Sequence, residues 1–296
     1  MLIVGKSGQL AQSLIAVCRQ HAIDAVALGR PQLDLLSPQS ISSTITRLNP
    51  SVVIMAAAYT QVDKAEDEPG QAFAVNADGA GAVAAAAARA GIPVVYISTD
   101  YVFDGSKTAP YSEDDPPNPL SVYGSSKLKG EEIVAAQNND HVIVRTSWLY
   151  SPFGSNFLKT MLRISQTRDE VSVVADQIGC PTSAFDLAEG LLSLSGRLRV
   201  DPDPALRGVF HMCGRGATNW ADFADEIFRT ASQYGLPSCR VKPISTAEYR
   251  SSAVRPANSV LCGKKLADIY GIALPDWRQS TRRVVQDIIQ NQEAGR

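Results

Sequence analysis

The feature that most constrains the fold is a regular alternation of short apolar runs and helical patterns along the first half of the chain. The apolar runs lie at residues 2–4, 25–28, 51–58, 92–97 and 141–145. Helical patterns separate them, among them an alanine-rich stretch over residues 71–90. Alternation of this kind predicts a parallel sheet with helices on both faces. We expect an α/β fold whose doubly wound, Rossmann-like parallel sheet occupies residues 1–150.

Beyond residue 150 the alternation becomes irregular. Helical patterns occur at 157–164, 183–194, 220–234 and 277–290, and apolar runs occur at 171–174 and 209–212. We expect residues 151–296 to form a smaller C-terminal α/β lobe that binds substrate. Some segments, at about 183–212, are expected to return to the first domain.

Composition narrows the class of protein. The 296 residues carry a net charge of −2 with no run of Lys or Arg, which argues against a nucleic-acid partner. The most apolar long segment, residues 80–90, is too short to span a membrane, and the N-terminal apolar run is too short for a signal peptide. The five cysteines are scattered, which is typical of free thiols in a reducing cytosol, so we expect a cytoplasmic protein. The three histidines lie far apart, and we predict no metal site.

A glycine loop follows the first apolar run directly. Gly5 and Gly8 stand three residues apart, and Ala11 occupies the third small position of a G-x-x-G-x-x-A pattern that opens a helix. Such a loop lets the backbone approach a dinucleotide pyrophosphate, which then meets the free N–H groups of the helix. Any tight turn could also carry two glycines. The loop lacks the Gly-Lys-Ser/Thr that a P-loop requires.

The second apolar run ends at Gly29-Arg30, where NAD enzymes usually carry an acidic residue. An Arg at this place can pair with a 2′-phosphate, which favours NADPH, with NADH possible. A solvated surface Arg is the alternative. Asp34 and Leu35 follow at a distance where the chain could pass the adenine.

Small residues end the run at 51–58 and leave space for a cofactor beside Ala58, Tyr59 and Thr60. Asn76 lies near the start of the next helical pattern, either as support for the site or as a buried amide.

The candidate catalytic residues lie in the segment from Ser98 to Lys127. Ser98, Thr99 and Asp100 follow an apolar strand, and carboxyl ends of strands are where ligands bind in α/β proteins. Tyr123 and Lys127 stand four apart, on one face of a predicted helix. An ammonium beside a phenol lowers its pKa, and the same ammonium can hold a nicotinamide ribose. Tyr123 could then donate a proton to a carbonyl oxygen while hydride reaches its carbon, with the Thr99 hydroxyl polarising that oxygen.

The alternative is a core tyrosine with a solvated lysine beside it. A long loop, predicted to be exposed over residues 104–120, could cover or flank this place.

Several motifs resemble the extended short-chain dehydrogenase/reductases, and within them the dTDP-4-dehydrorhamnose reductases. They are Gly5-x-x-Gly8-Gln9-Leu10, Ala56-Ala57-Ala58-Tyr59-Thr60, Ser98-Thr99-Asp100-Tyr101, Tyr123-Gly124-x-x-Lys127, Arg145-Thr146-Ser147-Trp148, Gly154-Ser155-Asn156-Phe157, Asp176-Gln177-x-Gly179-x-Pro181-Thr182 and Arg255-Pro256-x-Asn258-Ser259. The resemblance runs nearly end to end. It adds Gln9 and Leu10 to the expected cofactor contacts.

The resemblance implies NADPH-dependent reduction of the 4-keto group of dTDP-4-dehydro-L-rhamnose, in the biosynthesis of surface polysaccharides. It makes Thr99, Tyr123 and Lys127 the catalytic set, with Tyr123 and Lys127 also touching the cofactor. The nucleotide sugar would contact Thr99, Asp100 and Trp148. Asn156 and Arg255 are further candidates, because the fork of an Arg suits a diphosphate.

For the oligomeric state, we expect a monomer or a weak homodimer. Some members are described as magnesium-linked dimers that use interface glutamates, but this chain has Gln12-Ser13 after the glycine loop.

Three alternatives stay open. The first is a dehydratase or epimerase of the same superfamily, although a dehydratase needs an extra acid after Asp100, where this chain has Tyr101. A 4-ketoreductase for another nucleotide deoxysugar would share every motif. A non-catalytic NADP-binding regulatory subunit is less favoured, because Tyr123 and Lys127 are both present.

Overall fold

The computed structural model describes residues 1–294, so the last two residues of the expected 151–296 lobe lie outside the described part. Its centre is a six-stranded sheet in the order β10-β5-β4-β3-β1-β2, with every neighbouring pair parallel. The strands are β1 Leu2–Val4, β2 Val26–Leu28, β3 Val53–Met55, β4 Val94–Thr99, β5 His141–Thr146 and β10 Gly208–His211. This confirms the α/β class and the Rossmann-like parallel sheet.

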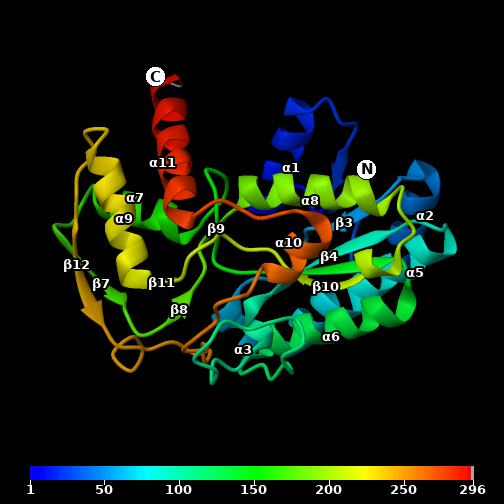
Figure 1. Cartoon of the computed structure of the whole chain (residues 1–296), viewed down its shortest axis with the longest axis horizontal. Helices are drawn as coiled ribbons and strands as arrows, with labels where there is room; N and C mark the ends of the chain where they lie inside the picture. The colour runs from blue at the N-terminus through cyan, green and yellow to red at the C-terminus, as the bar shows by residue number, and fades with distance from the viewer. Residues whose placement is uncertain (295–296) are drawn as a thin grey trace.

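Helices cover both faces of this sheet, and each face has its own apolar core (Figure 1). On one face α1 Gln9–Gln20 packs against α8 Ala184–Leu198, with Leu14 and Leu191 fully buried in the shared core. On the other face lie α2 Pro38–Leu48, α5 Ala80–Arg89 and α6 Val122–Gln137. The alanine-rich face of α5 lets α6 approach closely, since a Cβ on Gly81 would lie 2.3 Å from Ile133.

The helix predicted over 71–90 is interrupted. It consists of α4 Pro69–Phe73, a π-helical turn at Ala74–Gly79 and α5, after a short α3 at Val62–Asp67. A π-turn inserts an extra residue and redirects the side chains around it, and such turns are frequent at functional sites. Here the turn carries the buried Asn76.

The second lobe has its own apolar core, built around Trp277 and Phe223. Its elements are the parallel pair β7 Glu170–Val174 and β12 Arg240–Ile244 with the helices α7 Phe157–Ile164, α9 Trp220–Ser232 and α11 Trp277–Ala294. Two further short pairs are β6 Leu149–Tyr150 with β9 Thr182–Ser183, and β8 Ile178–Gly179 with β11 Thr218–Asn219. Strand β12 and α10 Lys264–Tyr270 have no counterpart among the elements expected from the sequence.

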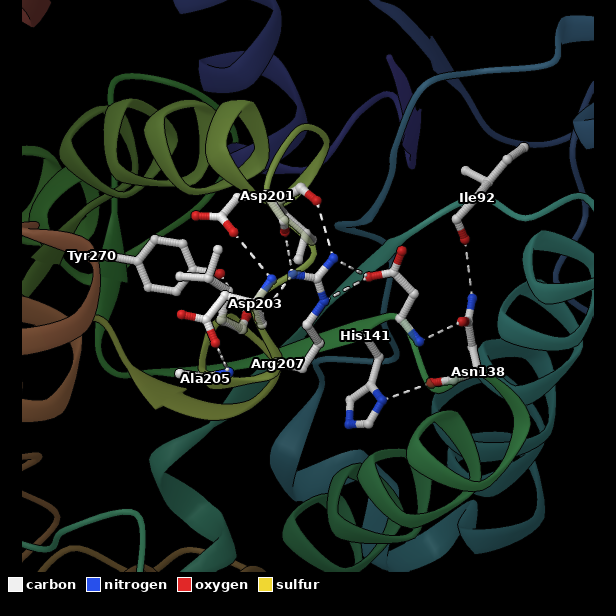
Figure 2. Close-up of polar contacts among 11 residues, drawn as sticks. Ile92, Asn138, His141, Asp201, Asp203, Ala205, Arg207 and Tyr270 are labelled. Atoms are coloured by element: carbon white, nitrogen blue, oxygen red, sulfur yellow. Dashed lines mark hydrogen bonds and ion pairs between the residues drawn. The ribbon is translucent and has the colours of Figure 1, made fainter.

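Within the C-terminal half, α8 and β10 pack with the first lobe. Their connection is fastened by Arg207 at the amino ends of the strands, and Figure 2 shows its guanidinium between Asp201 and Asp203. Arg207 Nη1 donates to the Asp201 carbonyl at 2.6 Å, and Nε donates to the Asp140 carboxylate at 3.0 Å. The Tyr270 hydroxyl donates to the Leu206 carbonyl at 2.6 Å beside it.

The loop expected to be exposed over residues 104–120 is anchored at its middle. Tyr111 is only 4% exposed, and its ring stacks on Phe103 with centroids 4.2 Å apart. The Tyr111 backbone also bonds to Val260 and Cys262. The expectation of an exposed loop is therefore wrong for Tyr111, because the many prolines concealed one buried aromatic anchor. Among the described residues, no helix is both long and apolar enough to cross a membrane.

Candidate active site

The carboxyl end of β4 and the start of α6 meet at one place. Ser121 caps α6, its hydroxyl accepting from the Gly124 N–H at 3.1 Å. A Cβ on Gly124 would lie 2.2 Å from the Tyr101 carbonyl, so glycine lets the helix start pack onto the turn that follows Thr99. Tyr123 therefore lies beside Thr99, with its ring edge-on to Tyr101 at 5.9 Å between centroids.

Lys127 is buried one turn further along α6, with 1% of its surface exposed. Its Nζ donates to the Ile97 carbonyl at 2.6 Å and lies 3.9 Å from the centroid of the Tyr96 ring. Burial lowers the pKa of Lys127 to about 7, while the Glu131 carboxylate opposes that shift. The lysine is thus a buried amine rather than a solvated one.

Burial raises the pKa of Tyr123 to about 12, against an opposing contact with Thr99. The sequence predicted the opposite direction, with Lys127 lowering this pKa. In the structure the ammonium is bound to Ile97 and burial dominates, so the phenol keeps its proton. A protonated phenol is the form that a proton donor requires.

Asp100 is buried against the same place. Its Oδ1 accepts from the Thr99 hydroxyl at 3.1 Å, and its Oδ2 has no hydrogen-bond partner among the described residues. Burial raises the pKa of Asp100 to about 7, so this carboxyl changes charge near neutral pH. A buried, half-satisfied carboxyl at a strand end is a feature of functional sites.

Asn76 connects three elements around the site. Its Oδ1 accepts from the Tyr59 N–H at 2.8 Å, and its Nδ2 donates to the Tyr59 carbonyl at 3.1 Å. The same amide group donates to the Ser126 hydroxyl at 2.9 Å, which in turn donates to the Tyr123 carbonyl at 2.8 Å. Asn76 therefore fixes the chain after β3 relative to α6. The sequence left open whether Asn76 supports the site or is only a buried amide, because the π-turn that turns it inward has no sequence pattern of its own.

The glycine loop forms a cradle at the start of α1. Gly5 has φ +114°, and a Cβ there would lie 3.1 Å from the Ala57 nitrogen. Gly8 is the N-cap of α1 without a side-chain cap, and nothing lies within 4 Å of where its Cβ would be. The helix N-terminus is thus open to a phosphate group, as a dinucleotide site requires. Leu10 is buried in the core, so only its backbone faces this loop.

The other predicted cofactor contacts lie along the same edge of the sheet. Arg30 is exposed after β2. The Asp34 carboxylate accepts from the Leu36 N–H at 3.0 Å and so stabilises its own turn. Leu35 packs against Gly79 of the π-turn. The remaining three, which follow β3, are Ala58 and Tyr59, both half-buried, and the exposed Thr60.

Gln9 lies at the boundary of the two lobes. Its Oε1 accepts from Asn156 at 2.9 Å and from Ser151 at 3.1 Å. Asn156 also caps α7, its Oδ1 accepting from the Lys159 N–H at 3.0 Å. The side chain of Asn156 thus holds loops together at the base of the site.

Trp148 adopts φ +46°, a left-handed conformation that is uncommon outside glycine. Its indole stacks on Trp220 with centroids 3.6 Å apart and 6° between planes. One face of Trp148 is therefore covered by Trp220, and Gly179 lies against the Cε2–Nε1 part of the indole. The side chain as a whole is half-buried, so part of it is accessible to a ligand. Trp220 lies in the second lobe and was not among the predicted site residues, since the sequence pattern marked it only as the start of a helix.

Arg255 reaches the site from the far end of the chain. Its Nη2 donates to Asp63 Oδ2 at 2.6 Å and its Nη1 donates to Oδ1 at 3.2 Å. Asp63 also accepts from the Ala253 N–H at 3.1 Å. The pair fastens the 250–258 segment to α3, next to Tyr101. Burial raises the pKa of the Tyr101 phenol, and the Arg255 guanidinium opposes that shift.

Comparisons with known proteins agree with this geometry. The RmlD substrate binding domain family matches residues 1–290. A dTDP-4-dehydrorhamnose reductase of Sinorhizobium fredii is 48% identical over 96% of each chain. The crystal structure of a dTDP-4-dehydrorhamnose reductase from Bacillus anthracis in complex with NADP is 36% identical, with a TM-score of 0.89 over 97% of this chain and 98% of that one.

The corresponding structure from Clostridium acetobutylicum is 38% identical, with a TM-score of 0.90 over 98% of this chain and 99% of that one. The similarity covers both lobes and reaches nearly from end to end. It confirms the resemblance drawn from the motifs. The chain belongs to the dTDP-4-dehydrorhamnose reductase family of oxidoreductases.

Proposed function

We propose that this protein reduces the 4-keto group of dTDP-4-dehydro-L-rhamnose to give dTDP-L-rhamnose, with NADPH as the reductant and NADH as a possible substitute. The observation that carries the proposal is the meeting of Thr99 with Tyr123 at the carboxyl end of β4, above the buried Lys127. Full-length relatives with this activity in their names support the substrate.

The residues present fit a dinucleotide. The open N-terminus of α1 and the cradle between Gly5 and Gly8 would hold the pyrophosphate. Arg30 is free to meet a 2′-phosphate, and Lys127 would contact the nicotinamide ribose. The relative from Bacillus anthracis was solved with NADP, which supports this choice. When bound, NADPH supplies the hydride that reduces the carbonyl carbon.

The chain supplies the proton and the orientation. The Tyr123 phenol, kept protonated by burial, would donate its proton to the carbonyl oxygen. The Thr99 hydroxyl would hold that oxygen and stabilise its developing charge. Lys127 would then stabilise the phenolate that remains, because an ammonium one helical turn away favours the charged form.

Substrate contacts come from both lobes. Asp100 and the uncovered parts of Trp148 face the place where the sugar would lie, and Arg255 would meet the diphosphate with donors that Asp63 leaves free. Asn156 is engaged with Gln9 and with the start of α7, so we assign it to shaping the pocket as well as to the predicted contact.

We propose that residues 1–150, with about 183–212, form the cofactor domain and that the rest of 151–296 forms mainly the substrate lobe. The parallel pairing of β10 with β5 supports the return of the later segment. The five free cysteines support a reducing, cytoplasmic setting. The predicted monomer or weak homodimer stays a prediction.

A coupled assay tests the function. The product of an upstream dehydratase and epimerase, dTDP-4-dehydro-L-rhamnose, is supplied with NADPH, the loss of absorbance is followed, and the sugar is identified by chromatography and NMR. We expect stoichiometric formation of dTDP-L-rhamnose. Another deoxysugar as the preferred product would indicate a different 4-ketoreductase. NADPH binding without turnover of any dTDP-ketosugar would indicate a regulatory subunit and refute the proposal.

A further inference from the structure

A buried ion pair lies directly beneath the candidate catalytic residues. The side chains of Glu131 and Arg145 are only 5% and 4% exposed. Arg145 Nε donates to Glu131 Oε1 at 3.0 Å, and Nη2 donates to Oε2 at 2.7 Å, which is a bidentate arrangement. The Ser98 hydroxyl donates to the same Oε1 in a short hydrogen bond. Neither charge takes part in the proposed proton transfer.

The three partners occupy positions next to the catalytic set. Ser98 precedes Thr99 in β4, and Arg145 stands opposite Ser98 in the register of β4 and β5. Glu131 follows Lys127 by one turn of α6, so both side chains point from the helix toward β4. The Glu131 carboxylate thereby connects α6 to β4, the strand that carries Thr99. Any rotation or axial shift of α6 relative to β4 would break these bonds.

This layer holds two basic side chains, Lys127 and Arg145, beside the carboxylate of Glu131. Lys127 faces the Tyr96 ring from β4 and, on its own helix, the carboxylate of Glu131. Glu131 pairs with Arg145, and its carboxylate also raises the pKa of Lys127 against the effect of burial.

Two other titratable groups, His211 and Asp100, lie near Arg145 and Tyr123. His211 from β10 stays neutral beside Arg145, because burial lowers its pKa to about 3. Asp100 acts on Tyr123 from the end of β4. Burial has the larger effect on the pKa of Lys127 and lowers it, and Glu131 is the charged group that opposes this effect.

We propose that Glu131 is a positioning residue of the active site: it fastens α6 to β4 and β5 through Ser98 and Arg145, and its carboxylate keeps the buried Lys127 ammonium charged. The inference rests on the proposed role of Lys127. A merely structural ion pair would behave differently. It would change the stability of the fold without changing the pH at which cofactor binding and turnover are lost.

The test compares Glu131→Gln with Glu132→Gln. The first removes the buried charge and keeps the shape of the side chain. The second makes the same change one residue later, where the side chain is 56% exposed and pairs with Lys129 on the surface. NADPH affinity is measured by fluorescence and kcat by the coupled assay, both from pH 5.5 to 9. Thermal unfolding of each variant is recorded in parallel.

We expect the alkaline loss of NADPH affinity and of kcat to move to lower pH by about one unit in Glu131→Gln. That shift corresponds to an about tenfold deficit at pH 8 that largely disappears at pH 6. The direction follows because Lys127 loses the carboxylate that favours its charged form. Glu132→Gln should keep the wild-type profile. A Glu131→Gln profile that coincides with wild type, with only a lower melting temperature, overturns the proposal.

Glu131→Gln leaves the buried Arg145 guanidinium without its ion-pair partner, so the double variant Glu131→Gln/Arg145→Gln is made as well. It removes both buried charges and should show the same direction of shift if the single variant does not fold.

The readouts separate this inference from the proposed function. If the wild type turns over no ketosugar, the function fails while the pH profile of NADPH binding still tests Glu131. If turnover is normal and both profiles are unchanged, only the inference fails.

Discussion

The indole of Trp148 fills the space that a side chain on Gly179 would need. A Cβ on Gly179 would lie 2.4 Å from the indole carbon Cε2 and 2.6 Å from its Nε1. Trp148 also adopts φ +46°, which costs a non-glycine residue about 1 kcal/mol or more. This conformation persists because Trp220 covers one side of the ring while the bare backbone of Gly179 accommodates it. The indole is thus placed by two contacts from the second lobe.

Gly179→Ala should displace Trp148 and weaken binding of the nucleotide sugar. We expect kcat/KM for the ketosugar to fall by about tenfold or more, the loss of roughly 1.4 kcal/mol of transition-state binding. NADPH affinity should stay near wild type, because the glycine loop is untouched. Gly196→Ala is the matched control. It lies within α8 with nothing near its Cβ, so it should keep activity and slightly stabilise the helix. Equal kinetics in both variants would contradict the placement of Trp148.

The sequence predicted the sheet well because each strand is a short apolar run between helical patterns. It also marked Thr99, Tyr123 and Lys127, whose polar groups interrupt those patterns. It could not predict the direction of the Tyr123 pKa, which depends on burial that only packing creates. Nor could it predict the pairing of Arg255 with Asp63, since no local pattern links residues so distant in the chain.

Tyr123→Phe tests the proton donor. Removing the hydroxyl should lower kcat by about 10²- to 10⁴-fold, the usual contribution of general acid catalysis. Affinity for NADPH should change little, because the phenol acts on the carbonyl oxygen. Steady-state kinetics and fluorescence titration measure the two quantities. Tyr234→Phe, at a 44% exposed tyrosine remote from the site, serves as the control. Turnover within a few-fold of wild type would rule out Tyr123 as the donor.

Arg30→Ala tests the preference for NADPH. A guanidinium bound to a 2′-phosphate forms charge-assisted hydrogen bonds, each worth about 1.5–3 kcal/mol. KM for NADPH should therefore rise by about tenfold or more, while KM for NADH should stay nearly constant. Arg47→Ala removes an exposed arginine near the end of α2 and should affect neither cofactor. An equal loss with both cofactors would show that Arg30 does not read the phosphate.

Asp100→Asn tests the raised pKa of the buried carboxyl. Its folded pKa of about 7 lies above the ordinary value of 3.8, so ionisation disfavours the folded state. The stability of the wild type should therefore decline as pH rises from about 4 to about 7 on account of this group, by about 1.4 kcal/mol for each unit of pKa shift. The amide of Asn does not titrate. We expect the unfolding free energy of the variant, relative to wild type, to increase between pH 5 and pH 8.

Urea unfolding at the two pH values measures this difference. Asp114→Asn, at an exposed carboxylate in the loop that flanks the site, should show no such dependence. A difference between Asp100→Asn and wild type that is constant over the whole range would place the titration of Asp100 outside this window.

Arg207→Met tests whether the hydrogen bonds that Arg207 makes in the connection between α8 and β10 contribute to fold stability and not to turnover. The guanidinium donates to the Asp140 carboxylate and to the carbonyls of Leu198, Asp201 and Asp203, so its loss leaves several acceptors without a partner (Figure 2). We expect the unfolding free energy to fall by about 2–3 kcal/mol. Turnover should be unchanged at temperatures where the variant is folded, because Arg207 lies at the amino ends of the strands and the candidate site lies at their carboxyl ends. Arg199→Met removes an exposed arginine from the same connection and should change neither quantity. A lower kcat in folded Arg207→Met would show instead that the β10 end communicates with the site across the sheet.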